Sequence, residues 1–467
     1  MELFAHQKKA IDFALKNNGC GALLMDTGTG KTRTALEIFR QINVPDIRLL
    51  VICPISLIES AWGDDIKKFT DFEYVNLRKK LIHGRIMIMN FEMLLSAKNI
   101  DFIKKMPEPI MCVVDESSRV KNNRSRTTKV LLSLRNKFAA RIVMSGTPCP
   151  NTEAELWPQI TFVGDILHRN FYVFRNQYFH LARGSQVMNG TVINKHMARE
   201  IFSKGWKYAI TPDSKKKLMD GIAPWTFFCR KQDCLDLPDQ VDEVRVVELP
   251  PDIRRHYHQM KNECIIEINS MPIVAQTALT RILRLRQITS GFALGEVPVS
   301  FKGSPKINEL QDILEEAGDQ QVIIWCQFHK EIDMVTSVLG EKCCTLYGLT
   351  KDKDASINAF KSGEKQYLVA HPRSASFGLT FINCSLQIFY SMDYSWEMYE
   401  QARARTHRAG QVNKCTYIHI VAGNTIDEHI LDALRKKKDA VELLYSYIGI
   451  RPDQEGQGRH QKEVAKV

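Results

Sequence analysis

The sequence predicts an α/β protein with two lobes, each built on a parallel sheet, and a mainly helical insertion between them. Short apolar runs alternate with helix-length amphipathic stretches near the amino-terminal end, and the same alternation returns near the carboxyl-terminal end. This alternation is typical of a parallel sheet whose two faces are covered by helices. At 467 residues the chain is also too long for one compact core and fits two or three domains.

Five apolar runs are the expected strands of the first lobe, residues 1–161. Each is bounded by polar residues or by glycine and proline, and enough chain separates them for crossover helices. The runs are GALLM (21–25), RLLVICP (48–54), IMIMN (86–90), IMCVVDE (110–116) and ARIVMSG (140–146).

The second lobe is expected over residues 301–448, from a matching set of apolar runs. These are QVIIWCQ (321–327), KCCTLYG (342–348), YLVAH (367–371), LQIFYSM (386–392) and CTYIHIVA (415–422). Between the lobes, residues 162–300 carry the patterns RHYHQMKNECIIEI and TALTRILRLRQI, which predict helices and an inter-lobe linker. Residues 449–467 are polar and poor in apolar side chains, so we expect a mobile tail there.

The bulk composition narrows the class of protein and its surroundings. Lys and Arg outnumber Asp and Glu by 64 to 53, a net charge of +11, which is consistent with a polyanionic partner. The chain start lacks the features of a signal peptide, and no apolar run reaches the roughly 18 residues that cross a bilayer. We therefore expect an intracellular protein without a membrane partner. The twelve cysteines form no CxxC pair, which favours small buried side chains in a reducing compartment over metal ligands.

A glycine loop, DTGTGKT, follows the first expected strand and opens a helical pattern. The backbone N–H groups of such a loop surround phosphate oxygens at the positive end of the helix dipole. Lys31 would reach the β- and γ-phosphates, and the Thr32 hydroxyl would ligate Mg²⁺. Met25 stands where the general pattern has glycine. The loop residues expected to contact the nucleotide are Thr27, Gly28, Thr29, Gly30, Lys31 and Thr32.

Two adjacent carboxylates end the expected strand at 110–116. Asp115 would hold the Mg²⁺ shell, and Glu116 would orient and deprotonate an attacking water. Unpaired charge at a buried strand end is costly, which favours a catalytic use. An N-cap for the following helix is the structural alternative. Together, the loop and the acidic pair predict a site that hydrolyses ATP.

In chain order these segments resemble the superfamily 2 helicases, and within them the SWI/SNF-type ATPases, which have two RecA-like lobes. The resemblance runs from about Leu3 to Gly423. LFAHQKKAI resembles the segment whose glutamine, here Gln7, reads adenine. DTGTGKT matches motif I, CPISLIESAWGDDIKKF resembles motif Ia, and MSGTPCPN resembles the LTGTPLQN of motif III. DESSRVKN stands where the family has DEAHRIKN, with Ser118 in place of histidine, and FFCRKQDCLDLPDQ resembles the segment that introduces the second lobe.

The second lobe carries the remaining motifs of this family. VIIWCQF resembles motif IV, HPRSASFGLTF occupies motif V, and QARARTHRAGQ is similar to the QAxxRxHRIGQ of motif VI. The resemblance implies that Arg405 and Arg408 are arginine fingers, with Gln401 and Gln411 near the nucleotide. A guanidinium offered to the γ-phosphate stabilises the charge of the transition state. Because these residues and Lys31 belong to different lobes, lobe motion and hydrolysis would be linked.

The resemblance places nucleic-acid contacts on motifs Ia, Ib, IV and V, where short hydroxyl and amide donors suit a grip on backbone phosphates. The alternative for each residue is an ordinary solvated or packed side chain. An aromatic and basic cluster between Trp157 and Tyr178 favours packing in a helical protrusion over base stacking. The expected contacts are Ser56, Asn90, Phe91, Arg119, Lys121, Arg230, Lys231, Arg373, Ser374 and Ser376.

The sequence therefore predicts a DNA-stimulated ATPase that uses ATP and Mg²⁺, moves along double-stranded DNA and remodels branched DNA by branch migration, fork regression or annealing. The FGLTF ending of motif V is nearer the annealing-helicase branch than the chromatin remodellers, and the short chain resembles compact phage, viral or bacterial motors. DNA repair, recombination and replication are the processes this activity would serve, and we expect a monomer. The alternatives are a strand-separating helicase on single-stranded DNA or RNA, and an ATP-gated motor subunit of a larger DNA-processing complex.

Overall fold

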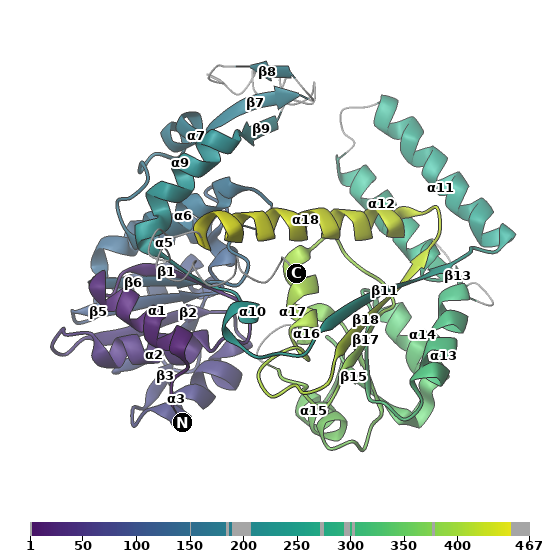
Figure 1. Cartoon of the computed structure of the whole chain (residues 1–467), viewed down its shortest axis with the longest axis horizontal. Helices are drawn as coiled ribbons and strands as arrows, with labels where there is room; N and C mark the ends of the chain where they lie inside the picture. The colour runs from purple at the N-terminus through teal and green to yellow at the C-terminus, as the bar shows by residue number, and fades with distance from the viewer. Residues whose placement is uncertain are drawn as a thin grey trace, which may run out of the picture. The chain divides into compact units, whose positions relative to one another are not determined.

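The computed structural model describes residues 2–149, 151–183, 186–188, 207–270, 275–293, 299–300, 304–375 and 379–449. The chain divides into two compact units (Figure 1). Unit 1 comprises Met1–Cys234 with Asp439–Val467, and unit 2 comprises Leu235–Lys438. Each unit holds one parallel sheet, which confirms the predicted α/β class with two parallel-sheet lobes. The tail predicted to be mobile lies, from residue 450 on, outside the described residues.

The sheet of unit 1 has seven parallel strands in the order β10-β1-β6-β5-β2-β4-β3. The five predicted runs form β1 (Gly21–Met25), β2 (Arg48–Cys53), β4 (Ile86–Asn90), β5 (Ile110–Asp115) and β6 (Ala140–Met144). Their side chains are almost entirely buried, as expected of strands covered on both faces. The edge strands β3 (Tyr74–Asn76) and β10 (Thr226–Cys229) were not predicted.

Helices connect these strands and extend unit 1 beyond its sheet. Helix α1 (Ala5–Lys16) precedes β1, and α6 (Leu156–Val163) follows β6. The helices between strands are α2 (Lys31–Gln41), α3 (Asp64–Phe69), α4 (Ala97–Lys104) and α5 (Arg126–Leu134). The extension contains α7 (Phe171–Tyr178), α9 (Pro212–Ile222) and an antiparallel sheet of β7 (Phe179–Arg183), β8 (Gln186–Met188) and β9 (Lys207–Ile210). The stretch predicted to be mainly helical therefore also contains strands.

The predicted aromatic cluster, which spans α6 and α7, is mostly packing. Trp157, Phe162 and Phe174 are no more than 6% exposed and belong to the hydrophobic core of unit 1. Phe171 packs edge-on against Trp157, with ring centroids 5.3 Å apart. Tyr172 is 55% exposed. The interpretation of the cluster as core rather than as a base-stacking surface is confirmed for the buried rings.

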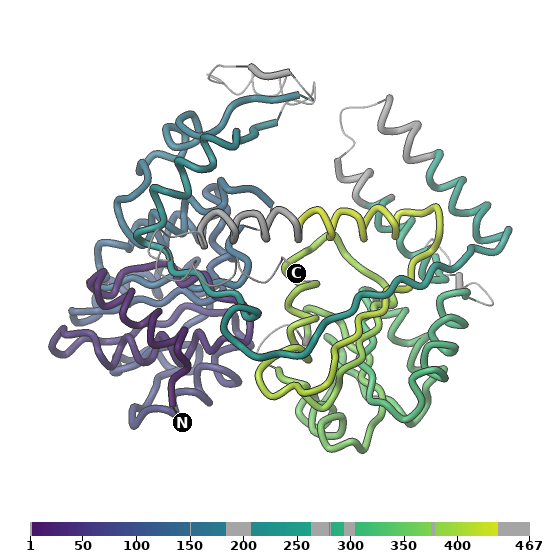
Figure 2. The backbone as a smooth tube through the Cα atoms, in the orientation of Figure 1, coloured from purple at the N-terminus to yellow at the C-terminus, as the bar shows by residue number. Residues whose placement is uncertain are grey.

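The sheet of unit 2 has six parallel strands in the order β11-β18-β17-β14-β16-β15. The predicted runs form β14 (Val322–Trp325), β15 (Cys343–Leu346), β16 (Tyr367–Ala370), β17 (Leu386–Phe389) and β18 (Cys415–Ala422). The sixth strand, β11 (Gln240–Val247), was not predicted. It pairs with β18 from Gln240–Cys415 to Val247–Ala422, and Figure 2 shows the two backbones side by side.

Helices again surround the sheet of unit 2. The two helices predicted between the lobes are α11 (Pro251–Ser270) and α12 (Ala275–Thr289), and a short pair of strands, β12 (Phe292–Ala293) and β13 (Val299–Ser300), follows them. The others are α13 (Pro305–Ala317), α14 (His329–Leu339), α15 (Lys353–Lys361), α16 (Pro372–Ala375), α17 (Trp396–Arg403) and α18 (Ile426–Gly449), the last of which runs on into unit 1. Within the described ranges, no helix is both long and apolar enough to span a membrane.

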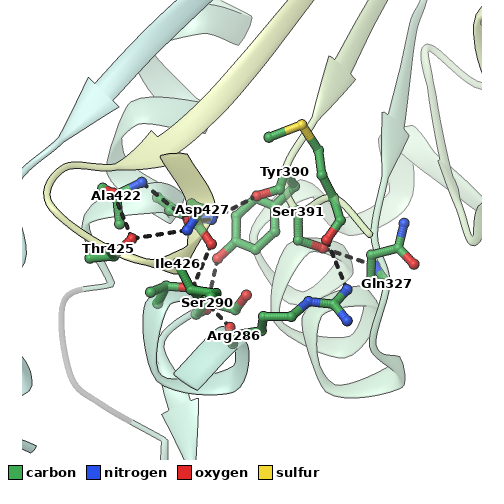
Figure 3. A network of polar contacts seen from close by, with 12 residues as sticks. Arg286, Ser290, Gln327, Tyr390, Ser391, Ala422, Thr425, Ile426 and Asp427 are labelled. Carbon is green, nitrogen blue, oxygen red and sulfur yellow. Dashed lines mark hydrogen bonds and ion pairs between the residues drawn. The ribbon is translucent and has the colours of Figure 1, made fainter. Parts of the chain in front are cut away.

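A buried polar network attaches the helices of unit 2 to its sheet (Figure 3). The Lys306 ammonium lies 2.6 Å from a carboxylate oxygen of Asp427, and the two side chains are 1% and 9% exposed. Thr289 donates to the other Asp427 oxygen at 3.0 Å, and Tyr390 donates its hydroxyl to the Ser290 carbonyl at 3.1 Å. The network therefore joins α12, α13 and α18 to the end of β17.

We expect Lys306→Met to destabilise the protein by about 3–5 kcal/mol, because it leaves the Asp427 carboxylate buried without its counter-ion. The free energy of unfolding from urea titration, followed by tryptophan fluorescence, measures the loss. Lys353→Met, at an exposed position on α15, is the matched control and should change little. Equal stability of the two variants would show that the Lys306–Asp427 pair contributes nothing.

Candidate active site

The glycine loop between β1 and α2 has a backbone that ordinary side chains disfavour. Gly28 and Gly30 have φ angles of +93° and +80°, in the left-handed region that glycine adopts readily. A Cβ on Gly30 would also lie 2.3 Å from the Nε2 atom of Gln7. The loop opens directly into α2, so its backbone lies at the positive end of that helix, where an anion is stabilised.

Lys31, the first residue of α2, turns its ammonium back onto the loop. Its side chain is 9% exposed, and Nζ donates to the carbonyl oxygens of Met25 at 2.9 Å and Asp26 at 3.3 Å. Thr32, beside it, is half-buried. A phosphate in the loop would therefore compete with two neutral carbonyls for this ammonium.

The acidic pair lies at the carboxyl end of β5. Asp115 is 4% exposed; its carboxylate accepts from the indole N–H of Trp62 at 2.9 Å and from the backbone N–H of Glu116 at 2.9 Å. Burial raises the pKa of Asp115, and the positive charge of Lys31 opposes that rise. Glu116 has a φ of +53°, an uncommon backbone for a residue with a side chain. The sequence did not predict the hydrogen bond between Trp62 and Asp115.

Ser117, directly after the acidic pair, is linked through Gln159 to the loop that follows β6, residues 145–148 or SGTP. Ser117 donates to the Gln159 side-chain oxygen at 2.6 Å, and the Gln159 amide donates to the Pro148 carbonyl at 2.7 Å. A Cβ on Gly146 would lie 3.2 Å from the backbone nitrogen of Thr27. The glycine loop, the acidic turn and the SGTP loop therefore pack directly on one another. Gln159 was not predicted as a site residue. A glutamine within the otherwise apolar stretch LWPQITFV could have indicated a buried polar contact.

Helix α1 braces the glycine loop from its other side. Gln7 is 1% exposed; its amide donates to the Gly30 carbonyl at 3.3 Å, and its side-chain oxygen accepts from the Phe4 backbone at 3.0 Å. His6 Nε2 lies 2.8 Å from the Thr29 carbonyl. The residue predicted to read adenine is thus bonded to the phosphate loop itself.

Two thiols lie next to the same loop. The Cys229 Sγ at the end of β10 lies 2.9 Å from the Cys234 Sγ on the short helix α10 (Lys231–Cys234). The hydrogen bond from Cys229 lowers the pKa of Cys234 to about 6, with His6 acting in the same direction, and it raises the pKa of Cys229. The Asp26 carboxylate accepts from the Lys231 backbone N–H at 3.0 Å. The chain that leaves β10 is thereby fastened to the glycine loop.

In unit 2 the predicted fingers lie just after α17. Arg405 is 3% exposed; its guanidinium donates to the carbonyls of Gln401 at 2.8 Å and Leu379 at 2.9 Å. Arg408 is half-buried and donates to the Leu379 carbonyl at 3.0 Å and the Thr380 hydroxyl at 2.6 Å. Both arginines therefore contact the end of the FGLTF segment.

The neighbouring polar residues of this motif have different surroundings. Gln411 donates to the carbonyls of Cys384 at 2.9 Å and Thr406 at 3.3 Å, so its amide holds the turn together. Gln401 is 3% exposed, and its side-chain oxygen has no hydrogen-bond partner among the described residues. Arg403, which was not predicted as a site residue, forms a two-pronged ion pair with Asp242 and ties α17 to β11.

The predicted nucleic-acid contacts of unit 1 lie beyond the carboxyl ends of its strands. Ser56 follows β2 and is exposed, and Asn90 ends β4, where it is only 3% exposed. Phe91 is 6% exposed and packs in the core, so any contact with DNA would fall to its backbone. Arg119 is exposed and Lys121 is half-buried, both just after β5.

The other predicted contacts are spread over both units. Arg230 is half-buried and Lys231 is 9% exposed, beside the glycine loop. In unit 2, Arg373 is exposed and Ser374 is half-buried on α16, beyond the carboxyl end of β16. Ser376 lies outside the described residues. All of these contacts stay predictions.

Two family models match the chain. The SNF2-related domain matches residues 6–291, which is more than half of the chain, and the helicase conserved C-terminal domain matches residues 305–410. The first range contains the glycine loop and the acidic pair. The second contains Arg405 and Arg408 but stops one residue before Gln411, the last residue of their motif.

Individual proteins with similar sequences differ in how much of them this chain spans. Protein p41 of Acyrthosiphon pisum secondary endosymbiont phage 1 is 24% identical, with 89% of this chain and 91% of that protein covered. The ATP-dependent helicase MG018 of Mycoplasma genitalium is 25% identical, with 94% and 42% covered. A Caenorhabditis elegans homologue of the SWI/SNF-related matrix-associated actin-dependent regulator of chromatin subfamily A-like protein 1 is 23% identical, with 94% and 61% covered. The chain thus spans less than two thirds of the last two proteins.

Among solved structures, the chain is similar to the SWI2/SNF2 ATPase core of Sulfolobus solfataricus in complex with double-stranded DNA. The sequence identity is 22% and the TM-score is 0.44, with 97% of this chain and 98% of that chain covered.

Proposed function

The chain belongs to the SNF2-related family, and on that premise we propose that it is a motor that moves along duplex DNA and remodels branched DNA. Family membership makes it an ATP hydrolase of helicase superfamily 2, with the ATP-dependent helicase or translocase core of that family. The identity of the track, its branched form, and a role in DNA repair, recombination or replication are parts of the proposal.

For the nucleotide, the residues of unit 1 fit Mg²⁺-ATP. Gly28 and Gly30 give the loop a left-handed backbone that can cradle phosphate, and Lys31 would exchange two carbonyl partners for phosphate oxygens. Thr32 and Asp115 supply the hard oxygen ligands that Mg²⁺ prefers. The ion would neutralise charge on the β- and γ-phosphates.

For hydrolysis, we assign Glu116 to orient the attacking water and accept its proton. Trp62 holds the neighbouring Asp115 carboxylate in place through its indole N–H. Arg408 and Arg405 would stabilise the negative charge that spreads over the γ-phosphate oxygens. Because these arginines belong to unit 2 and Lys31 to unit 1, hydrolysis would require both units.

One observation supports the motor most strongly: in unit 1, the nucleotide residues and the predicted track residues follow the carboxyl ends of strands in one parallel sheet. The glycine loop follows β1, the acidic pair ends β5, Ser56 follows β2 and Asn90 ends β4, and β5, β2 and β4 are neighbours in the sheet. In parallel sheets, ligands bind at this edge. A change at the γ-phosphate could therefore reach a DNA-binding loop through directly adjoining strands.

The test is the rate of ATP hydrolysis against a panel of linear duplex DNA, single-stranded DNA, a fork, a four-way junction and duplex RNA. We expect stimulation by duplex DNA, with the largest effect from the fork and the junction, and conversion of the junction in a gel assay. Separation of plain RNA or DNA duplexes would favour the strand-separating helicase instead. A rate that no nucleic acid changes would contradict the proposal and favour an ATP-gated subunit of a larger complex.

A further inference from the structure

Three side chains that bind divalent metals meet at the carboxyl end of β10. They are His6 of α1, Cys229 of β10 and Cys234 of α10, and one ligand atom from each lies within 4.8 Å of the others. His6 and Cys229 are buried and Cys234 is half-buried. All three belong to unit 1. The spacing of the cysteines alone did not predict a site, because the third ligand comes from the other end of this unit's sequence.

The histidine of this cluster is oriented as metal-bound histidines usually are. A carbonyl oxygen only accepts hydrogen bonds, so the 2.8 Å contact between His6 Nε2 and the Thr29 carbonyl places the ring proton on Nε2. The lone pair of Nδ1 is then the ligand. Metal-binding histidines typically donate their other N–H to a carbonyl or carboxylate in this way, which fixes the tautomer and the ring.

We propose that His6, Cys229 and Cys234 form a zinc site. Two thiolates and an imidazole are the ligands of a borderline-soft divalent cation, and Cys-x4-Cys falls within the usual spacing of zinc ligands. Three protein ligands leave a fourth tetrahedral position for water. The Asp26 carboxylate, which accepts from the Lys231 backbone N–H at 3.0 Å, adds a negative charge on the segment between the two cysteines, and that charge favours a cation there.

Binding requires only a small movement of the two sulfur atoms. They lie 2.9 Å apart. Tetrahedral Zn–S bonds of about 2.3 Å would place them about 3.8 Å apart, so they must separate by about 0.9 Å. Cys234 is half-buried on a helix of a single turn, so a rotation of its side chain can supply this movement.

The position of the site suggests what the ion would do. The Cys229 carbonyl accepts from the Asp26 backbone at 2.9 Å, and His6 contacts the Thr29 carbonyl, so two ligands are already bonded to the glycine loop. Cys234 is the last residue of unit 1 before the chain enters unit 2. The ion would therefore fix α1, the glycine loop and the exit of the chain from unit 1 to one another.

The test measures metal binding by the full chain, purified under reducing conditions, stripped with a chelator and then supplied with Zn²⁺ or Co²⁺. We expect about one equivalent of Zn²⁺ per chain, and a Co²⁺ spectrum with the strong visible bands and thiolate charge transfer of a tetrahedral site. Cys234→Ser and His6→Asn should each lower the stoichiometry toward zero. Cys343→Ser, at a half-buried cysteine in unit 2, is the matched control and should keep full binding.

A second measurement keeps the proposal testable if a variant folds poorly. In the unmodified chain, Zn²⁺ should slow alkylation of Cys234 at least tenfold, as counted by peptide mass spectrometry, and leave Cys343 unaffected. Absence of bound Zn²⁺, or equal binding by Cys234→Ser and the parent chain, would overturn the site. So would a disulfide-linked peptide joining Cys229 to Cys234, two hydrogens lighter than its reduced form, in protein purified without reductant and free of metal.

Discussion

Lys31→Ala is expected to lower the kcat of ATP hydrolysis by roughly 10²–10³-fold or more, because it removes the positive charge aimed at the transferred phosphate. In the structure the Lys31 ammonium donates only to neutral loop carbonyls, those of Met25 and Asp26. Its positive charge also favours the ionised form of the buried Asp115, but without it that carboxyl can take up a proton instead of staying as an unpaired charge. The fold and DNA binding should therefore largely survive, and phosphate release with and without DNA measures the loss of turnover.

The matched control is Lys9→Ala, at an exposed position on α1. It removes one lysine from the same unit, and its turnover should equal that of the parent chain. Thermal unfolding and DNA binding should be similar for both variants. If Lys31→Ala hydrolyses ATP at the parental rate, the glycine loop is not where the γ-phosphate binds.

Much of the fold followed from burial, because strands covered on both faces consist mostly of apolar side chains. GALLM and VIIW are fully buried and were found as continuous apolar runs. The strands missed in the two parallel sheets lie at sheet edges. In β11 charged and apolar residues alternate and most side chains are partly exposed, so QVDEVRVV carries no such run. β10 is half-buried and β3 is three residues long, too short for any periodic signal.

The site divides in the same way between local and long-range features. The glycine loop and the acidic pair are contiguous in sequence, so their chemistry could be predicted from the residues themselves. The bond between Trp62 and Asp115 joins residues 53 positions apart, and the bond between Ser117 and Gln159 joins residues 42 apart. Contacts of this kind depend on strand order, which no local pattern encodes. The cluster around His6 was missed for the same reason.

The largest effect expected in unit 2 comes from Arg408→Ala, which should preserve ATP binding yet slow hydrolysis by roughly 10³-fold or more. A guanidinium stabilises charge that develops on the γ-phosphate only in the transition state, so its loss affects turnover more than affinity. Arg405 is 3% exposed and donates to the carbonyls of Gln401 and Leu379, as expected of a residue that holds the backbone of this motif in place. Arg408 is half-buried, so it is the more accessible of the two.

Nucleotide titration measures the affinity of the variant for ATP, and single-turnover hydrolysis measures the rate of its chemical step. Arg408→Lys restores the charge without the planar fork and should recover only part of the rate. Arg435→Ala, exposed on α18, is the matched control and should hydrolyse ATP normally. Arg408 also donates to the Leu379 carbonyl and the Thr380 hydroxyl, and Arg408→Ala removes both hydrogen bonds. A thermal melt must therefore show that the variant keeps unit 2 folded. A folded Arg408→Ala variant with parental turnover would remove Arg408 from the catalytic site and leave Arg405 as the residue that must carry the role.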